Sequence, residues 1–292
     1  MKKNGIFARL CMALIVIFMY APIIVLIVFS FNESKSRTVW TGFSLHWYQD
    51  LFSNESILSA LATTLEVSVI AMVVATVLGT AAAIGFWSMR RRSRAVVMAI
   101  NNVPMTNADI ITGVSLMMLF VFAFTAFNNS WLSEVTGINL RTGFGTLLMA
   151  HITFDVPYVI LSVLPKLNQL NPHLYEAALD LGATPAYAFR KVVLPELLPG
   201  ILSGAMLAFT MSMDDFVISY FTAGSGASTL AMEIYSMTRK RISPEINALS
   251  AIIFVAVLVV LIIVNVHSVR QEKAKARQEQ IWKSTEDTPA VS

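Results

Sequence analysis

The stretch NPHLYEAALDLGATPAYAFRKVVLPELLPG, Asn171–Gly200, is a polar segment set between two long apolar runs. Its start, Asn171–Pro172, favours a helix, because asparagine caps free N–H groups and proline suits the first helical position. Gly182 predicts the end of this first helix in a left-handed C-cap. Thr184–Pro185 repeats the start signal, and the second helix is expected to run to about Val193. We therefore predict two short helices joined by a glycine bend.

The composition of the chain is that of a membrane protein. Of the 292 residues, 56% are hydrophobic and 13% are charged, whereas soluble proteins carry about 25% charged residues. The net charge is only +3, and no basic block with interleaved aromatics suggests a nucleic-acid partner. The single cysteine, Cys11, excludes an intrachain disulfide and any multi-thiolate metal site. The solvent of this chain is therefore expected to be lipid.

Six apolar stretches are long enough to cross a bilayer as helices, which takes about 20 residues each. The sequence thus predicts an all-α polytopic membrane protein, with residues 1–269 as the membrane domain and 270–292 as a polar cytoplasmic tail. A signal peptide is the alternative for the first stretch, but its apolar run is too long and lacks an A-x-A site. The predicted spans are residues 10–31, 63–87, 104–127, 143–164, 197–221 and 246–269.

The distribution of Lys and Arg predicts the orientation. With the N-terminus inside, fifteen of these residues fall in inner segments and six in outer loops, which favours both termini in the cytoplasm. The loop Asn171–Gly200 is then cytoplasmic. An outer loop carries FSLHWYQDLF (Phe43–Phe52), where Trp47, Tyr48 and Phe52 suit an interfacial helix at headgroup level. A lid over a translocation path is the alternative for this segment.

Five acidic residues lie within the predicted spans, which contain no Lys or Arg. A charge near mid-bilayer costs roughly 2.5–3.5 kcal/mol on insertion scales, so uncompensated acids suggest a path whose substrate brings the positive charge. A polyamine, with separated ammonium groups, suits such a set. The candidate substrate-path residues are Glu66, Asp109, Asp155, Asp214 and Asp215.

Each acid also has a structural interpretation. Glu66 lies near an outer helix end and is expected to be hydrated there. Asp109 is placed to cap a broken helix. Asp155 follows His151 by four residues, so the two share a helix face and are expected to pair with each other. Asp214 and Asp215 are expected about 100° apart around one helix, with one facing a cavity and the other a neighbouring helix.

The chain lacks the motifs of an enzyme. There is no G-x-x-x-x-G-K-[ST] loop for ATP, no H-E-x-x-H and no G-x-S-x-G. The four histidines are scattered over different segments, and no third ligand accompanies His151 and Asp155 to make a metal site. We expect no catalytic residue, metal or cofactor on this chain.

One motif in the polar loop resembles a known family. Glu176-Ala177-Ala178, then Gly182 after three residues, then Val192-x-Leu194-Pro195 after nine more, resembles the EAA motif of ABC importer permeases, EAA-x3-G-x9-I-x-L-P. Val192 in place of isoleucine is the one departure. The resemblance implies a MetI-like permease fold in which this loop fits a cleft on an ATPase subunit. It implies that the contact includes Glu176, Ala177, Ala178, Gly182, Leu194 and Pro195, and Asp180 adds an acidic i, i+4 partner to Glu176.

The resemblance extends from about Ile6 to Val269. FSLHWYQDLF, LGTAAAIGF and SMDDFVISYFTAG are similar to the polyamine branch of this family, the C-type permease subunits of spermidine/putrescine importers. This implies a second similar permease, two ATP-binding subunits that hold ATP and Mg²⁺, and an extracytoplasmic polyamine-binding protein, at a bacterial plasma membrane. The alternatives are a stand-alone secondary transporter or channel for organic cations, and a membrane scaffold without a transport role.

Overall fold

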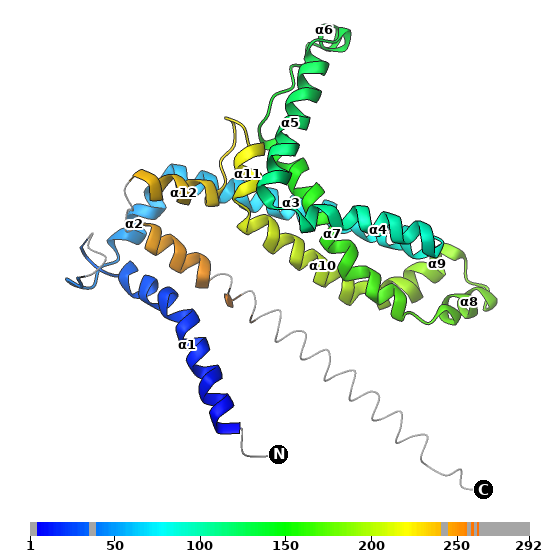
Figure 1. The fold of residues 1–292 in the computed structure, drawn as a ribbon, viewed down its shortest axis with the longest axis horizontal. Helices are drawn as coiled ribbons and strands as arrows, with labels where there is room; N and C mark the ends of the chain where they lie inside the picture. Colours follow the sequence, from blue (N-terminus) through cyan, green and yellow to red (C-terminus); the bar gives the residue numbers. More distant parts are fainter. Residues whose placement is uncertain (1–4, 35–38, 241–244, 256–257, 260–261, 263–292) are drawn as a thin grey trace. The chain divides into compact units, whose positions relative to one another are not determined.

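The computed structural model describes residues 5–34, 39–240, 245–255, 258–259 and 262, and its regular elements are helices, apart from one bridge between Asn32 and Phe43. This confirms the predicted all-α class (Figure 1). The helices are α1 (Gly5–Ser30), α2 (His46–Ser53), α3 (Glu55–Ser88), α4 (Arg91–Thr106), α5 (Asp109–Asn128), α6 (Trp131–Thr136), α7 (Phe144–Gln169), α8 (Pro172–Asp180), α9 (Pro185–Ala188), the π-helical turn η1 (Phe189–Val193), α10 (Leu194–Asp214), α11 (Val217–Thr222) and α12 (Leu230–Lys240).

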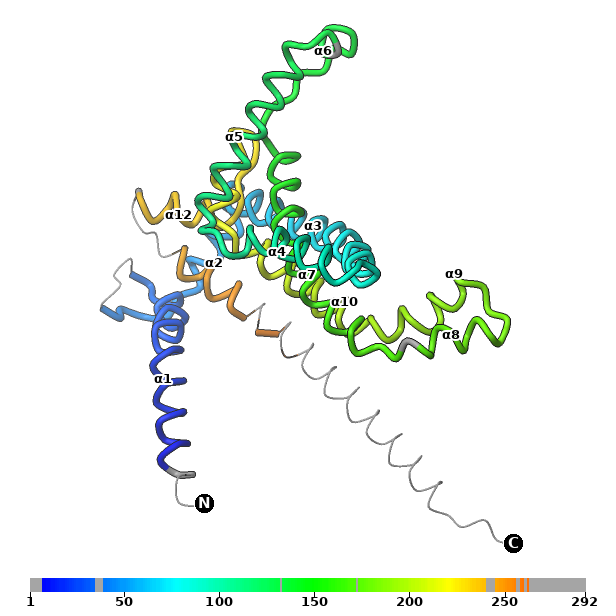
Figure 2. The backbone as a smooth tube through the Cα atoms, turned by 45° about the vertical axis from the view of Figure 1, so that its right-hand side comes forward, coloured from blue at the N-terminus to red at the C-terminus, as the bar shows by residue number. Residues whose placement is uncertain are grey.

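The chain divides into two compact units, which are described separately. The larger unit is Glu55–Ser236, and the smaller unit combines Met1–Asn54 with Met237–Ser292. In the larger unit α3, α7 and α10 run side by side, and the α8–α9 segment lies at one end of them (Figure 2). The candidate site residues other than the N-terminal aromatics all belong to this unit.

Small residues at the crossing points let α3, α7 and α10 approach closely, as is usual between membrane helices. A Cβ built at Gly79 of α3 would lie 2.7 Å from the Cβ of Val159 on α7. A Cβ at Gly204 of α10 would lie 3.2 Å from the Cα of the same valine. The glycines are therefore required by packing. The buried apolar core around them consists of Ala75, Ala83, Val159, Ile160, Val163, Leu164, Leu167, Val193, Leu197 and Ala208.

Within the part of the chain that the structure describes, five helices are long and apolar enough to cross a membrane: Phe7–Ser30, Glu55–Ser88, Asp109–Asn128, Phe144–Gln169 and the continuous run Pro185–Asp214. In the region of the sixth predicted span, a shorter apolar helix covers Glu245–Val255. Most of the remainder of that span, and the whole predicted tail 270–292, lie outside the described residues.

Two predicted span boundaries are wrong. The span predicted at 104–127 begins at Asp109, because Asn107 and Ala108 are extended, with ψ of 152° and 135°. The residues before them belong to α4, of which only residues 104–106 had been predicted as helix. The span predicted at 197–221 is interrupted, because Asp215 is also extended (ψ 122°). Asp214 ends α10 and α11 begins at Val217, so the expectation that Asp214 and Asp215 share one helix is wrong.

In the smaller unit, Trp47 has a structural role. Its side chain is 4% exposed, and its Nε1–H donates to the carbonyl of Asn32 at 2.7 Å. Asn32 is itself buried and donates from Nδ2 to the carbonyl of Val39 at 2.9 Å. Trp47 therefore packs inside this unit, where its ring closes the turn that follows α1, and does not present its side chain to lipid headgroups. Phe52, which is 64% exposed, remains available for that role.

Candidate functional site

The loop Asn171–Gly200, called the EAA loop below, has the predicted caps. Asn171 Oδ1 accepts from the N–H of His173 at 3.0 Å, and Pro172 is the first residue of α8. Gly182 has φ +84°, a conformation that costs other L-residues roughly 1–2 kcal/mol. The end of α8 is a Schellman arrangement, in which Ala183 N–H donates to the carbonyl of Ala178 at 3.0 Å and Gly182 N–H to that of Leu179 at 2.9 Å. The glycine bend is confirmed.

The second half of the loop differs from the prediction. Thr184 accepts from the N–H of Tyr187 at 3.4 Å and begins α9 as expected. The helix does not stop near Val193, however, but continues through η1 into α10. The wider turn is explained by Pro195, which lacks the N–H of a regular α-helical bond. α9 is therefore the first part of a continuous 30-residue helix, Pro185–Asp214, and α8 precedes this helix across the glycine bend.

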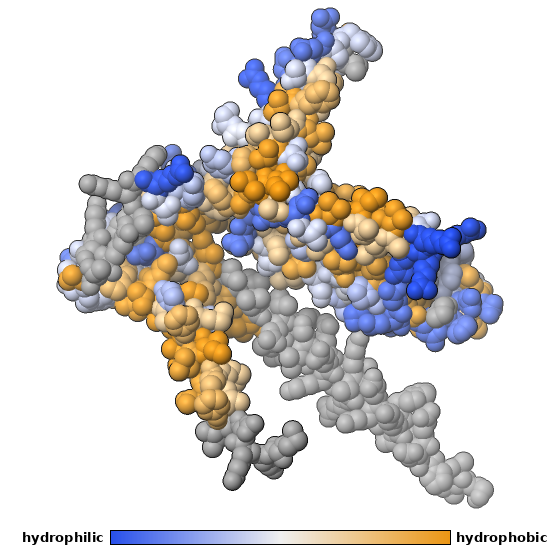
Figure 3. Space-filling view, viewed as in Figure 1, coloured by the Kyte–Doolittle hydropathy of each residue, from blue (hydrophilic) through white to orange (hydrophobic). Residues whose placement is uncertain are grey.

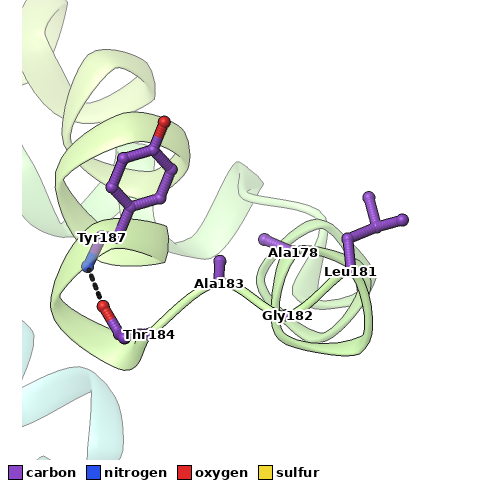
Figure 4. A pocket seen from close by; sticks show the side chains of 6 residues that line it. All are labelled: Ala178, Leu181, Gly182, Ala183, Thr184 and Tyr187. Atoms are coloured by element: carbon purple, nitrogen blue, oxygen red, sulfur yellow. Dashed lines mark hydrogen bonds between the residues drawn. The ribbon is translucent and has the colours of Figure 1, made fainter.

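A shallow pocket of about 530 Å³ lies between α8 and α9. Figure 4 shows Leu181 directed away from the remainder of the pocket, and this side chain is 90% exposed. An apolar side chain so fully exposed at the end of the bundle is available to a protein partner. The pocket is lined by Ala178, Leu181, Gly182, Ala183, Thr184 and Tyr187.

The acidic pair of the EAA loop is also exposed. Glu176 Oε2 lies 3.2 Å from Nδ1 of His173, and both side chains are largely in solvent. Asp180 is the last residue of α8, and the last turn contains no basic residue. A carboxylate there opposes the helix dipole, at a cost of about 0.3–1 kcal/mol. Because Asp180 destabilises the isolated helix, its presence is better explained by a contact with a partner than by the stability of α8.

The membrane acids fall into two groups. Glu66, Asp109 and Asp214 are exposed on the surface of this chain, whereas Asp155 is 0% exposed and the side chain of Asp215 is 9% exposed. Asp109 is the first residue of α5, where its charge favours the helix N-terminus. A helix break does precede it, but the expectation that Asp109 caps α5 is wrong, because the N-cap is Ala108. The five acids therefore differ in their exposure, and three of them lie on the surface of this chain.

Asp215 holds the break between α10 and α11. Its carboxylate accepts from the N–H groups of Ile218 at 3.2 Å and Ser219 at 2.7 Å, and from the Ser219 hydroxyl at 2.9 Å. The side chain thus supplies the acceptors that the first turn of α11 lacks. Asp215 has a structural role in this arrangement, and its predicted contact with substrate gains no support from the geometry.

His151 completes the same network from α7. Its Nδ1 lies 2.6 Å from Ser212 Oγ on α10, and its Nε2 lies 3.0 Å from Ser219 Oγ on α11. Asp215 Oδ2 is 3.7 Å from the same Nε2. The prediction that His151 pairs with Asp155 is therefore wrong, because serines on both sides of the break occupy the two ring nitrogens.

Asp155 is left without a partner. Both carboxylate oxygens are buried and make no hydrogen bond within the described residues. Asp155 lies close to Asp215 and to Tyr158, and Tyr158 in turn lies close to the exposed Asp109. Ser212, Ser219 and Tyr158 were not predicted from the sequence. Ser212 and Ser219 flank the Asp214–Asp215 pair in a mostly apolar stretch, and this pattern would have identified both serines.

Known proteins are similar to this chain over most of its length. Residues 75–274 match the family described as binding-protein-dependent transport system inner membrane component. The putrescine transport system permease protein PotI of Escherichia coli (strain K12) is 39% identical over 265 residues, which cover 90% of this chain and 91% of PotI. The spermidine/putrescine transport system permease protein PotC of the same strain is 37% identical over 251 residues, 86% of this chain and 89% of PotC.

Solved structures agree at the level of the fold. A crystal structure of a bacterial alginate ABC transporter, in complex with a periplasmic protein that holds an alginate pentasaccharide, contains a similar chain. Its TM-score is 0.66 at 18% identity, with 89% of this chain and 93% of that chain covered. The predicted MetI-like permease fold is confirmed. The chain belongs to the family of binding-protein-dependent transport system inner membrane components, the multi-pass permease subunits of ABC importers.

Proposed function

We propose that this permease takes up polyamines. The observation that supports the proposal is the set of acidic residues on helices without bases: α3, α5, α10 and α11 contain no Lys or Arg. The polyamine names of the relatives PotI and PotC support the same substrate class. A cation with two or more separated ammonium groups matches carboxylates that are themselves separated along a path.

The exposed acids are the best candidates for that path. Glu66, Asp109 and Asp214 lie on the surface of the single chain, so a second, similar permease subunit packed against this one would turn them toward a shared passage. Asp155 and Asp215 lie inside the subunit. They would affect the substrate path indirectly, through the residues that they contact. In this proposal Asp214 is the leading substrate residue, because it is both exposed and placed at the helix break.

The remaining partners follow from the exposed EAA loop. We propose that two ATP-binding subunits, which would hold ATP and Mg²⁺, dock on the loop with Glu176, Ala177, Ala178, Asp180, Gly182, Leu194 and Pro195 in or beside the contact. An extracytoplasmic polyamine-binding protein would deliver the substrate, and both chain termini would lie in the cytoplasm. Continuous helix from α9 through η1 to α10 would carry the movement of the ATPases directly to Asp214.

Co-expression of the chain with the candidate ATPase, second permease and binding protein tests this function. We expect the wild-type chain to co-purify with the ATPase and to support ATP-dependent uptake of labelled spermidine or putrescine. Glu176→Lys should abolish uptake while membrane insertion stays normal. Glu134→Lys, at an exposed acid of α6 outside the EAA loop, is the matched control and should transport normally.

Two results would overturn the proposal. Uptake by the wild-type chain reconstituted alone, without ATP, would instead identify a stand-alone carrier or channel. Wild-type uptake by Glu176→Lys would remove Glu176 from the contact with the ATPase.

A further inference from the structure

The corner between α3 and α4 carries a basic cluster that the transport function does not use. Arg90, Arg91 and Arg92 are consecutive and exposed. Among the described residues, none of the three forms an ion pair or a side-chain hydrogen bond, whereas nearby Arg94 donates to Asn168 Oδ1 at 3.0 Å. Three adjacent guanidinium groups repel one another, so this corner is suited to an anionic partner.

Apolar surface continues directly from this cluster. Before it, Trp87 is 39% and Met89 is 41% exposed. A tryptophan at the end of a membrane-spanning helix is typical of the headgroup level of a bilayer. Because α3 is long and apolar enough to cross a membrane, we expect the three arginines that follow Trp87 to lie at the level of the lipid phosphates.

The helix that begins at this corner has an uncovered apolar face. Val96, Ile100 and Val103 of α4 recur at i, i+4 and i+7 and are 60%, 65% and 51% exposed. Met98, on another face, packs against the α3–α7–α10 core. Figure 3 shows a strongly hydrophilic patch at the end of α4 that joins α3, beside hydrophobic surface along α4. Basic residues next to an apolar stripe are the pattern of a helix that contacts anionic lipid.

We propose that the α3–α4 corner binds an anionic phospholipid. Arg90, Arg91 and Arg92 hold the headgroup phosphate, and the acyl chains lie along Val96, Ile100 and Val103. An acidic protein surface would match the arginines but would leave the adjoining apolar stripe and Trp87 uncovered, whereas a lipid covers both. Arginine suits this role because its planar fork binds phosphate oxygens in pairs.

Native mass spectrometry of the purified full-length chain in detergent tests the proposal. The chain is titrated with phosphatidylglycerol and, in parallel, with zwitterionic phosphatidylcholine. We expect the wild type to bind phosphatidylglycerol preferentially, and the triple variant Arg90→Gln, Arg91→Gln, Arg92→Gln to bind it at least about tenfold more weakly. The triple lysine variant should retain the preference in part, because the positive charge is kept. Arg141→Gln, at an exposed arginine elsewhere, should behave as wild type.

Either of two results overturns the lipid assignment. Equal binding of both lipids by the wild type removes the preference itself. Undiminished phosphatidylglycerol binding by the triple glutamine variant, especially together with loss of ATPase co-purification, would assign the corner to the ATPase. Both results are independent of the substrate, so they leave the polyamine proposal standing.

Discussion

His151 Nδ1 and Ser212 Oγ lie 2.6 Å apart, and this contact ties α7 to the last residues of α10. The other ring nitrogen of His151 reaches Ser219 on α11 at 3.0 Å. The buried side chain of His151 therefore contacts both helices, α10 and α11, that meet at the break next to Asp214. The direction in which Asp214 points depends on α7 as well as on its own helix.

Loss of His151 should loosen this break. We expect His151→Ala to lower the free energy of unfolding by about 1–3 kcal/mol, because Ser212 and Ser219 lose a buried hydrogen-bond partner. Equilibrium unfolding in mixed micelles measures the change. His173→Ala, at an exposed histidine of the EAA loop, should change stability by less than about 0.5 kcal/mol. Equal effects of the two variants would show that the His151 contacts contribute little.

Replacement of Asp155 should stabilise the protein, whereas replacement of His151 should destabilise it. Its buried carboxyl makes no hydrogen bond to any residue that the structure describes, so Asp155→Leu should raise the free energy of unfolding by about 1–3 kcal/mol by removing an unsatisfied polar group. If Asp155 serves the substrate path, uptake should fall although the protein is more stable. Thr153→Leu, on the exposed side of the same helix, is the control for the added apolar volume. A destabilised Asp155→Leu protein would show that the carboxyl has a stabilising partner.

Gly182 offers a test of the bend in the EAA loop. A Cβ added there would meet no atom within 4 Å, so the effect of its positive φ of +84° is isolated from packing. We expect Gly182→Ala to cost roughly 1–2 kcal/mol locally and to reduce ATPase co-purification and coupled uptake. Gly182→Asn should retain more of both, because asparagine tolerates this conformation. Gly145→Ala, also in open space but without a positive φ, should be neutral. Equal activity of all three variants would contradict a requirement for the bend.

The parts of the fold that are local in sequence were predictable. The caps at Asn171 and Thr184 and the bend at Gly182 each depend on hydrogen bonds that span at most five positions, and all three are present. Most of the α4 helix was missed because its arginines and asparagines make it look like a loop. The break at Asp215 was missed because the stretch 197–221 is long and mostly apolar, with no glycine or proline near Asp214 and Asp215 to mark the end of a helix.

The candidate site depended more on tertiary structure. An i, i+4 spacing correctly placed His151 and Asp155 on one face, but the face meets two other helices, whose serines take both ring nitrogens. The burial of Asp155 and the exposure of Asp109 and Asp214 are likewise set by which helices pack against α7, α5 and α10. Spacing along one helix gives no information about those neighbours.

Uptake by the complete importer in proteoliposomes, measured for Asp214→Asn against Asp214→Glu, tests the central claim most directly. A hydrogen bond between an ammonium group and a carboxylate is worth about 1.5–3 kcal/mol, so we predict that Asp214→Asn raises the KM for labelled spermidine or putrescine by about 10- to 100-fold. Asp214→Glu should keep most of the uptake, and ATPase activity without substrate should be unchanged in both. An unchanged KM for Asp214→Asn, in a complex that assembles normally, would contradict a polyamine path past this helix break.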